Sequence, residues 1–469
     1  MMKNLGIAGI VLAAVSIGYL LNTPIPPDLA EPLYFRLFVA GLKVTDILTA
    51  LTMSLLPSDP NLHVRALRSI IEIGLPDPSQ QAIGSNLTAR YTNFDGIRVL
   101  VYEPVHRPDS PIPALVYFHG GGYALGSTKL HGYLTRHLAE RLNIVLVSVN
   151  YRLAPEHPLP AGPDDGVVAT RYLMQHADEF GIDPHRIIVA GDSAGGHLAT
   201  IVTHRIHDDS SLPDLKLQVL FYPWLQALHF HTPSYQLYHH TFGELGLSRS
   251  KVVGFVAYNI IQRLDADFER KVMRNMHMSP EFKRSAQFQM VFDHNIIHEK
   301  LANVSLNQDI TDLDSSYTSY PFDSLSDSIP KATFLSSLAL SPSTLLSSVI
   351  PLPTDYQTPL LSYEPLDAFE PGNETYWAEI QHHFLEGMSP LLREDMTGLP
   401  KAFIATADQD VLRDDGIFYS HALEQGGVEV DWINYRGAWH GMADLGIRRG
   451  LPIGIKMVED AIAFIQDNI

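Results

Sequence analysis

The sequence predicts an α/β protein with a mostly parallel central sheet and helices on both faces of that sheet. Short runs rich in β-branched and aromatic residues recur along the chain, and segments with helical periodicity separate them. The 469 residues, 45% of them hydrophobic, can bury a large core. A net charge of −19 and the absence of cysteine argue against a nucleic-acid partner, disulfides and a cysteine nucleophile.

The chain opens with an apolar segment. Leu5 to Leu21 is a run of 17 uncharged residues after Lys3, and as a helix it would extend over about 25 Å, enough to cross a bilayer. A cleaved signal peptide has the same basic start, but residues 22–32 offer no small-residue cleavage site, which favours an anchor over 1–22. The basic residue before the run and the acidic residues after it place the remainder of the chain across the membrane.

Asn-x-Ser/Thr triplets are consistent with that orientation. They occur at Asn86, Asn303 and Asn373, and each is a candidate glycosylation site. Since such triplets also arise by chance, they add modest weight to the membrane prediction.

Core strands are expected from residue 86 onward. Asp95-Gly96 predicts a hairpin over 87–94 and 97–104, because Asp-Gly readily supplies the positive φ values that such a turn needs. Further strands are predicted at 114–118, 143–150, 186–190, 215–222, 401–407 and 428–435, and an amphipathic helix at 455–469. Residues 86–224 and 400–469 are therefore expected to be two parts of one core.

A long insertion separates those two parts. Residues 225–399 are too many for a simple connection, so they predict a cap folded over the carboxyl edge of the sheet. Within the insertion, 301–365 is acidic and rich in Ser and Thr, which is typical of a solvated surface loop. The N-terminal region 23–85 is expected to add helices to the cap, with 34–56 packing one face against the cap or the bilayer.

The motif GDSAGG at 191–196 predicts a nucleophile. It lies between the strand predicted at 186–190 and an apolar-periodic helix, which is the strand–turn–helix context of a nucleophile elbow. Gly191 and Gly195 have no side chains to clash in the tight turn, so Ser193 can be held exposed above the sheet.

A serine nucleophile needs a base and an orienting carboxylate, which in this architecture follow it on loops after later strands. His440 lies in the segment RGAWHG that follows the last predicted strand and is the candidate base. Asp410 lies just past the strand at 401–407 and is the candidate acid, with Asp408 in reserve. Asp414 and Asp415 open the next helix and are expected to cap it and face its dipole.

The glycines at 120–122 predict an oxyanion hole. The anionic intermediate of acyl transfer needs backbone N–H donors, which come from the loop after the third strand and from the residue after the nucleophile. Gly120 and Gly121 let the backbone approach a carbonyl, and the Ala194 N–H completes the hole. We expect His119 to fix this loop by hydrogen bonding.

HGGG at 119–122, YRLAPEHP at 151–158, GDSAGG at 191–196 and DVLRDDG at 410–416 occur together and in order. This combination resembles the hormone-sensitive-lipase family of α/β-hydrolases, over about residues 1–300 and 385–469. The N-terminal segment is similar to the arylacetamide deacetylase and neutral cholesterol ester hydrolase branch. The resemblance implies a single-pass protein of the endoplasmic reticulum with a lumenal catalytic domain. It also implies Ser193 as nucleophile, Asp410 as acid, His440 as base, and His119, Gly120 and Gly121 as the oxyanion motif.

Together these features predict a membrane-anchored serine hydrolase that cleaves carboxylic esters, or amides, of neutral lipophilic molecules without a cofactor or a metal. Two alternatives use the same fold, namely a ligand-binding receptor and a lipid acyltransferase. A receptor that has lost its histidine is disfavoured because serine, acid and histidine are all present here. An acyltransferase would form the same acyl-enzyme.

Overall fold

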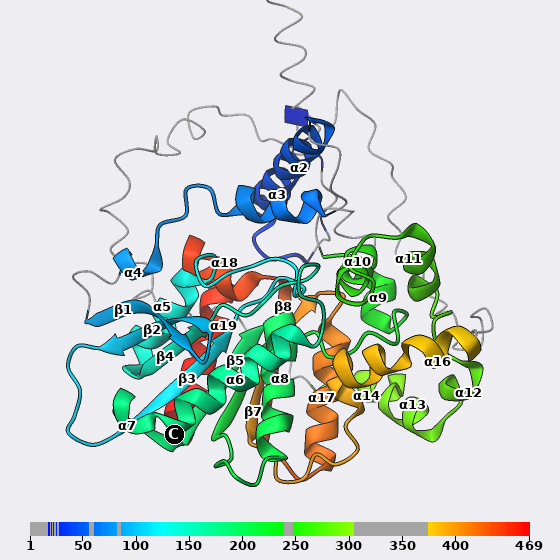
Figure 1. Cartoon of the computed structure of the whole chain (residues 1–469). Coiled ribbons are helices and arrows are strands. Elements are labelled where there is room, and N and C mark those ends of the chain that lie inside the picture. The colour runs from blue at the N-terminus through cyan, green and yellow to red at the C-terminus, as the bar shows by residue number, and fades with distance from the viewer. Residues whose placement is uncertain are drawn as a thin grey trace, which may run out of the picture. The chain divides into compact units, whose positions relative to one another are not determined.

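The computed structural model of the chain describes residues 17–18, 20, 22, 25, 28–55, 61–81, 86–238, 247–303 and 374–469. These residues form one eight-stranded sheet with the order β1-β2-β4-β3-β5-β6-β7-β8 (Figure 1). The strands are β1 (Leu87–Phe94), β2 (Ile97–Pro104), β3 (Ile112–Phe118), β4 (Val145–Val149), β5 (Ile182–Asp192), β6 (Leu217–Phe221), β7 (Lys401–Gln409) and β8 (Val430–Trp439).

The sheet is mostly parallel, as the sequence predicts. Strand β2 pairs antiparallel with both β1 and β4, and all later pairs, from β3–β4 to β7–β8, are parallel. The β1–β2 hairpin turns at Asp95 and Gly96, whose φ values are 47° and 90°. Two consecutive positive φ values match the right-handed twist of the flanking strands, so the Asp-Gly prediction is confirmed.

Helices cover both faces of this sheet, as expected. One face meets α5 (Gly132–Leu142) and α19 (Pro452–Asn468), whose buried side chains share a core cluster with Leu115 and Tyr117 of β3. The next residue, Phe118, points to the other face, where its ring lies beside Gly166 of α6 (Ala161–Gln175), next to Leu198 of α8 (Ala194–His207). Because helices cover these strands on both faces, neither face is in contact with solvent. Accordingly, every residue of β4 and β6 is buried.

The N-terminal region forms α2 (Pro32–Leu55), α3 (Leu62–Ile71) and α4 (Pro78–Gln81) before the first strand. The sheet and these helices belong to one compact unit of residues 1–308 and 369–469. The predicted anchor at 5–21 lies almost entirely outside the described residues. Among the described helices, none combines the length and the apolar character needed to cross a membrane.

The insertion between the two parts of the core is helical where it is described. It contributes α9 (Pro233–Tyr238), α10 (Arg249–Ile260), α11 (Ala266–Met273), α12 (Pro280–Lys283), α13 (Ala286–Val291), α14 (His294–Asn303) and α16 (Glu374–His382). Serine and aspartate side chains begin several of these helices, as Ser248 and Asp265 do for α10 and α11. Most of the acidic segment 301–365 lies outside the described residues. The chain then returns to the sheet at β7, which leads into α17 (Arg413–Gln425); α18 (Met442–Arg449) follows β8.

Candidate active site

The turn between β5 and α8 holds Ser193 in a strained backbone conformation. Its φ is 56° and its ψ is −121°, a backbone conformation that residues other than glycine rarely adopt. A Cβ on Gly191 would collide with the Gly195 carbonyl, and a Cβ on Gly195 would collide with the Phe118 carbonyl. The glycines therefore let the turn close, and the Ser193 N–H donates to Phe221 O at 2.9 Å, which fixes the turn on β6.

The register of the last two strands brings Asp410 and His440 together. Gln409 of β7 lies opposite Trp439 of β8, and each of these residues directly precedes one of the two candidates. His440 Nδ1 lies 2.6 Å from Asp410 Oδ2, and His440 Nε2 lies 2.9 Å from Ser193 Oγ. Asp410 is buried, and its second oxygen accepts from the Leu412 N–H at 3.0 Å. One histidine thus bridges a hydroxyl and a carboxylate that are far apart in the sequence.

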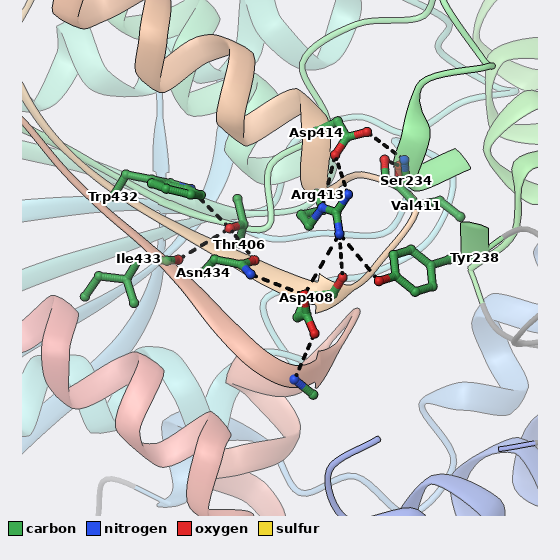
Figure 2. A network of polar contacts seen from close by, with 11 residues as sticks. Ser234, Tyr238, Thr406, Asp408, Val411, Arg413, Asp414, Trp432, Ile433 and Asn434 are labelled. Atoms are coloured by element: carbon green, nitrogen blue, oxygen red, sulfur yellow. Dashed lines mark hydrogen bonds and ion pairs between the residues drawn. The ribbon is translucent and has the colours of Figure 1, made fainter. Parts of the chain in front are cut away.

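Asp408, the reserve candidate, faces away from His440. Its carboxylate accepts from Asn434 Nδ2 and from the Gly437 N–H, both at 3.3 Å, and lies 3.9 Å from Arg413 Nη1. Figure 2 shows dashed lines that join Asp408 of β7 to Arg413 and to Asn434 of β8. These contacts hold the end of β8 in place and leave Asp410 as the carboxylate that reaches the histidine.

Asp414 and Asp415 do not cap the helix as expected, although both lie in its first turn, where the helix dipole favours a carboxylate. Leu412 is the N-cap of α17, and both aspartates lie inside the helix with fully buried side chains. Asp414 pairs with Arg413 at 3.0 Å and accepts from the Ser234 N–H at 2.6 Å (Figure 2). Asp415 accepts from the Leu225 N–H and from Gln226 Nε2, both at 3.0 Å. Because both carboxylates are buried, they bond to protein groups and not to solvent. These bonds fix the first residues of the insertion.

The loop after β3 also departs from the expected oxyanion hole at one position. The Gly120 N–H donates to Asp192 Oδ1 at 2.9 Å. This N–H group is therefore not available to a substrate oxygen. Within the described part of the chain, the N–H groups of Gly121, Gly122 and Ala194 make no such bond. Gly121 and Gly122 have φ values of 123° and 62°, so the peptides turn in a way that other residues disfavour. The available donors are therefore those of Gly121, Gly122 and Ala194.

His119 lies beneath this loop and is fully buried. Its Nδ1–H donates to the Gly120 carbonyl at 2.9 Å, and its ring stacks on Tyr151 with centroids 4.3 Å apart. The Tyr151 hydroxyl in turn donates to the His119 carbonyl at 2.6 Å. Burial lowers the pKa of His119 to about 3, so its ring is neutral at physiological pH. These contacts let His119 support the loop, and within the described residues no hydrogen bond joins its ring to Ser193.

Comparison with known proteins decides the family. A family model described as "alpha/beta hydrolase fold" matches residues 115–291 and 348–444, which together are more than half of the chain. The chain belongs to the α/β hydrolase fold family. The prediction of fold class from the sequence is confirmed.

This α/β hydrolase is similar to two groups of curated proteins along nearly its whole length. It is 30% identical to neutral cholesterol ester hydrolase 1 of Mus musculus, over 96% of both chains. It is 28% identical to arylacetamide deacetylase of Bos taurus, over 98% of both chains. Among solved structures, a hyperthermophilic esterase from Pyrobaculum calidifontis superposes with a TM-score of 0.51 at 25% identity, covering 90% of this chain and 97% of that one. The branch that the motifs indicate is confirmed.

A buried network of the hydrolase, absent from the sequence prediction, lies behind the oxyanion loop. Asp192 Oδ1 accepts from the Tyr117 hydroxyl at 2.7 Å as well as from the Gly120 N–H, and Asp192 Oδ2 lies 3.4 Å from His131 Nε2. Burial alone would raise the pKa of Asp192, but the charge on His131 and these donors hold it below its usual value. Burial likewise opposes the charge on His131, yet the Asp192 carboxylate raises the pKa of His131 to about 9. An ion pair thus fixes the peptide at Gly120.

Two helices of the hydrolase cover the outer side of the oxyanion loop. Arg68 of α3 donates to Ala124 O at 2.6 Å and also to Ala154 O. Asn259 of α10 donates to Gly122 O at 3.0 Å, and the Phe255 ring packs so closely on Gly122 that a Cβ there would collide with it. Polar side chains of the two helices thus hold the loop carbonyls, while Phe255, Val64 and Tyr258 supply apolar neighbours, which suit an uncharged ligand.

A separate hollow of the hydrolase, about 840 Å³ in volume, lies at the opposite ends of β7 and β8. It is open and mainly polar, and Lys401, Glu429 and Asp431 contribute to its lining. None of the residues that line it belongs to the Ser193 site or to the oxyanion loop. The hollow therefore has no part in the chemistry at the carboxyl edge of the sheet.

Proposed function

We propose that this chain hydrolyses carboxylic esters of neutral, lipophilic molecules through an acyl-enzyme on Ser193. The chain is an ester hydrolase of the α/β hydrolase family. The observation that carries the assignment of its site is the position of His440, with one ring nitrogen 2.9 Å from a hydroxyl and the other 2.6 Å from a buried carboxylate. That geometry suits a nucleophile, a general base and an orienting acid.

In the acylation step, Ser193 Oγ attacks the ester carbonyl carbon while its proton moves to His440 Nε2. The carbonyl oxygen becomes an oxyanion, which the N–H groups of Gly121, Gly122 and Ala194 stabilise. His440 then gives the proton to the alkoxide, the C–O bond breaks, and the alcohol leaves. Asp410 stabilises the imidazolium and fixes its tautomer throughout, because Nδ1–H donates to it.

In the deacylation step, water attacks the acyl carbon and gives its proton to His440. The second oxyanion collapses, Ser193 recovers its proton, and the carboxylic acid leaves. One ester and one water thus become one acid and one alcohol, and no oxidant or metal is needed to balance the reaction.

The proposed substrate class rests on the surroundings of the loop and on the relatives. Phe255 and the apolar residues of α3 and α10 lie beside the proposed oxyanion hole. The relatives carry names that refer to a neutral cholesterol ester and to arylacetamides. We therefore extend the proposal to lipophilic esters first and to arylacetamide-type amides second.

The proposed location is the endoplasmic reticulum membrane, with a single N-terminal anchor over 1–22 and the catalytic residues in the lumen. The uncharged run from Leu5 to Leu21 supports the anchor. Asn86 is exposed just before β1, so a glycan can be attached there; Asn303 ends α14, and Asn373 lies outside the described residues. Glycosidase treatment of full-length protein from eukaryotic cells tests the orientation. A chain that never carries glycans would leave the proposed lumenal orientation without support.

The proposed domain layout keeps the boundaries that the sequence predicts. The core comprises 86–224 and 400–469, and the cap comprises 23–85 and 225–399. The bonds from Asp414 and Asp415 to the start of the insertion support a cap that is fixed on α17 at that point.

A hydrolysis screen and active-site labelling test the proposed function. Purified full-length protein is assayed on p-nitrophenyl esters, cholesteryl esters and arylacetamides, and is treated with a fluorophosphonate probe. We expect ester hydrolysis and labelling that are both lost in Ser193→Ala and retained in Ser211→Ala, an exposed serine in a surface turn. Labelling without any hydrolysis would favour the receptor alternative, and unchanged labelling of Ser193→Ala would refute the nucleophile. Transfer of the acyl group to an added alcohol in preference to water would favour the acyltransferase.

A further inference from the structure

Helix α2 is apolar on two opposite faces, whereas a helix on the surface of a soluble protein normally has one apolar face and one polar face. On its inner face, Phe35 and Val39 are 2% and 1% exposed. At 3.6 residues per turn, a second set of apolar side chains falls on the other side of the helix. This outer face comprises Leu33, Tyr34, Leu37, Val44 and Ile47, which are between 42% and 65% exposed.

The inner face connects α2 to the residue before His440. The rings of Phe35 and Phe38 pack on the Trp439 ring, with centroids 5.1 and 5.3 Å apart. The chain just before α2 is held on the same strand, because the Ala30 N–H donates to Gly437 O at 2.9 Å. The position of α2 is therefore fixed relative to the end of β8, where the proposed general base lies.

The outer face has the composition of a surface that lies on lipid. It is a continuous apolar stripe, and exposed apolar stripes of this kind mark interaction sites. The charged residues Arg36 and Lys43 fall outside it, and Tyr34 and Arg36 lie near its start, where aromatic and basic side chains favour the headgroup region. Because α2 does not have the apolar character to cross a membrane, it would lie along the surface.

We propose that the outer face of α2 docks on a phospholipid bilayer and thereby holds the Ser193 site against the membrane that contains its substrate. The proposal rests on the proposed function and extends it by naming the docking surface. Continuity with the N-terminal run favours lipid over a second copy of the chain. Lys43 donates to Asn22 O at 3.1 Å and to Leu20 O at 3.4 Å, so the end of the uncharged run lies against α2.

Site-specific fluorescence on the full chain tests the docking. Because the chain contains no cysteine, one introduced cysteine carries one nitrobenzoxadiazole label. Leu37→Cys and Val44→Cys report on the outer face, and Met290→Cys of α13, 72% exposed, is the control. In phosphatidylcholine vesicles that contain doxyl-labelled lipid, we expect blue-shifted and quenched emission at residues 37 and 44 and neither change at 290.

Two results would overturn the docking. Emission at residues 37 and 44 that stays like that of residue 290 in vesicles would show that the outer face remains in water. A blue shift that lipid quenchers do not affect, and that rises with protein concentration, would assign the face to a second copy.

Activity on two substrates separates this proposal from the proposed function. Leu33→Ser/Leu37→Ser/Ile47→Ser should retain hydrolysis of a short water-soluble ester, while hydrolysis of a vesicle-resident cholesteryl ester falls by about ten-fold or more, since interfacial binding scales with buried apolar area. The control Val105→Ser/Leu264→Ser/Met290→Ser changes three exposed apolar residues elsewhere and should lose neither activity. Equal rates of the two triple variants on the vesicle substrate would refute the docking. A wild-type chain inactive on both esters would refute the proposed function, while the fluorescence would still decide the docking.

Discussion

Replacing Asp192 with asparagine should remove a pH-dependent part of the stability of the fold. In the wild-type chain, Asp192 raises the pKa of the buried His131 to about 9, whereas an unfolded histidine titrates near 6.5. Between these two values the folded chain holds a proton that the unfolded chain has lost. The stabilisation is therefore fully present below pH 6.5 and is lost as the pH rises through about 9.

The size of the effect follows from the shift in the pKa of His131. The shift from 6.5 to about 9 corresponds to about 3 kcal/mol, at about 1.36 kcal/mol per unit. In Asp192→Asn the main carboxylate that favours the charged histidine is gone, only the weaker effects of Asp444 and the Ser127 carbonyl remain, and burial then lowers the pKa of His131. The stability difference between wild type and variant should fall by about 3 kcal/mol from about pH 6 to about pH 9.5.

Urea unfolding followed by tryptophan fluorescence at several pH values measures this difference. Burial raises the pKa of Asp415 to about 8, and this group also titrates in the window, but it is present in both proteins and cancels. The control is Asp214→Asn, which removes the carboxylate 3.0 Å from the partly exposed His207. An exposed pair contributes only about 0–1 kcal/mol. Parallel pH profiles for wild type and Asp192→Asn would refute the assignment of a charged His131.

Three further predictions concern the site itself. Asp410→Asn should lower kcat/KM by about 10⁴-fold, because an amide stabilises the wrong tautomer, whereas Asp408→Asn should cost much less; the reverse order would move the assignment to Asp408. Gly195→Ala should abolish fluorophosphonate labelling, since its Cβ collides with a carbonyl of β3, while Gly41→Ala, with open space around it, should label normally. His119→Ala should reduce turnover by about 10²–10³-fold at most, the cost of one oxyanion donor, and complete loss of turnover in a folded protein would give that ring a direct role.

Folding of the oxyanion loop can be checked independently of turnover in each of these variants. The Gly120 peptide bonds to both the His119 ring and Asp192, so a variant that disturbs the loop should also lower the melting temperature. A loss of turnover without a shift in the melting temperature would assign the changed residue to the chemistry and not to the support of the loop.

The sequence by itself determined the features that depend on local sterics. Asp95-Gly96 sets the hairpin because both residues tolerate positive φ. The Gly-x-Ser-x-Gly spacing sets the turn at Ser193, since the two glycines are the positions where a Cβ would meet backbone. Strand periods and chain order likewise placed Asp410 and His440 after neighbouring strands. These features need only residues that are close in the sequence, so they are readable without the fold.

The tertiary structure decided every feature that joins distant segments. The sequence favoured Asp410 and kept Asp408 in reserve; the opposition of Gln409 and Trp439 brings Asp410 to His440, while the Asp408 carboxylate accepts from Asn434 and Gly437 of β8. The Gly120 N–H is occupied because Asp192 lies beside it, although 72 residues separate the two in the chain.

The roles of buried charges were equally hidden from the sequence. In the sequence, Asp414 and Asp415 resemble helix caps, yet they lie inside the first turn of α17 and bind an insertion that begins almost two hundred residues earlier. No motif near His131 in the sequence indicates a charge, which the Asp192 carboxylate beside it favours against the effect of burial. A side chain's partners depend on which strands and helices pack together. The sequence therefore determined which chemistry the chain can perform, and the packing decided which of its polar groups take part.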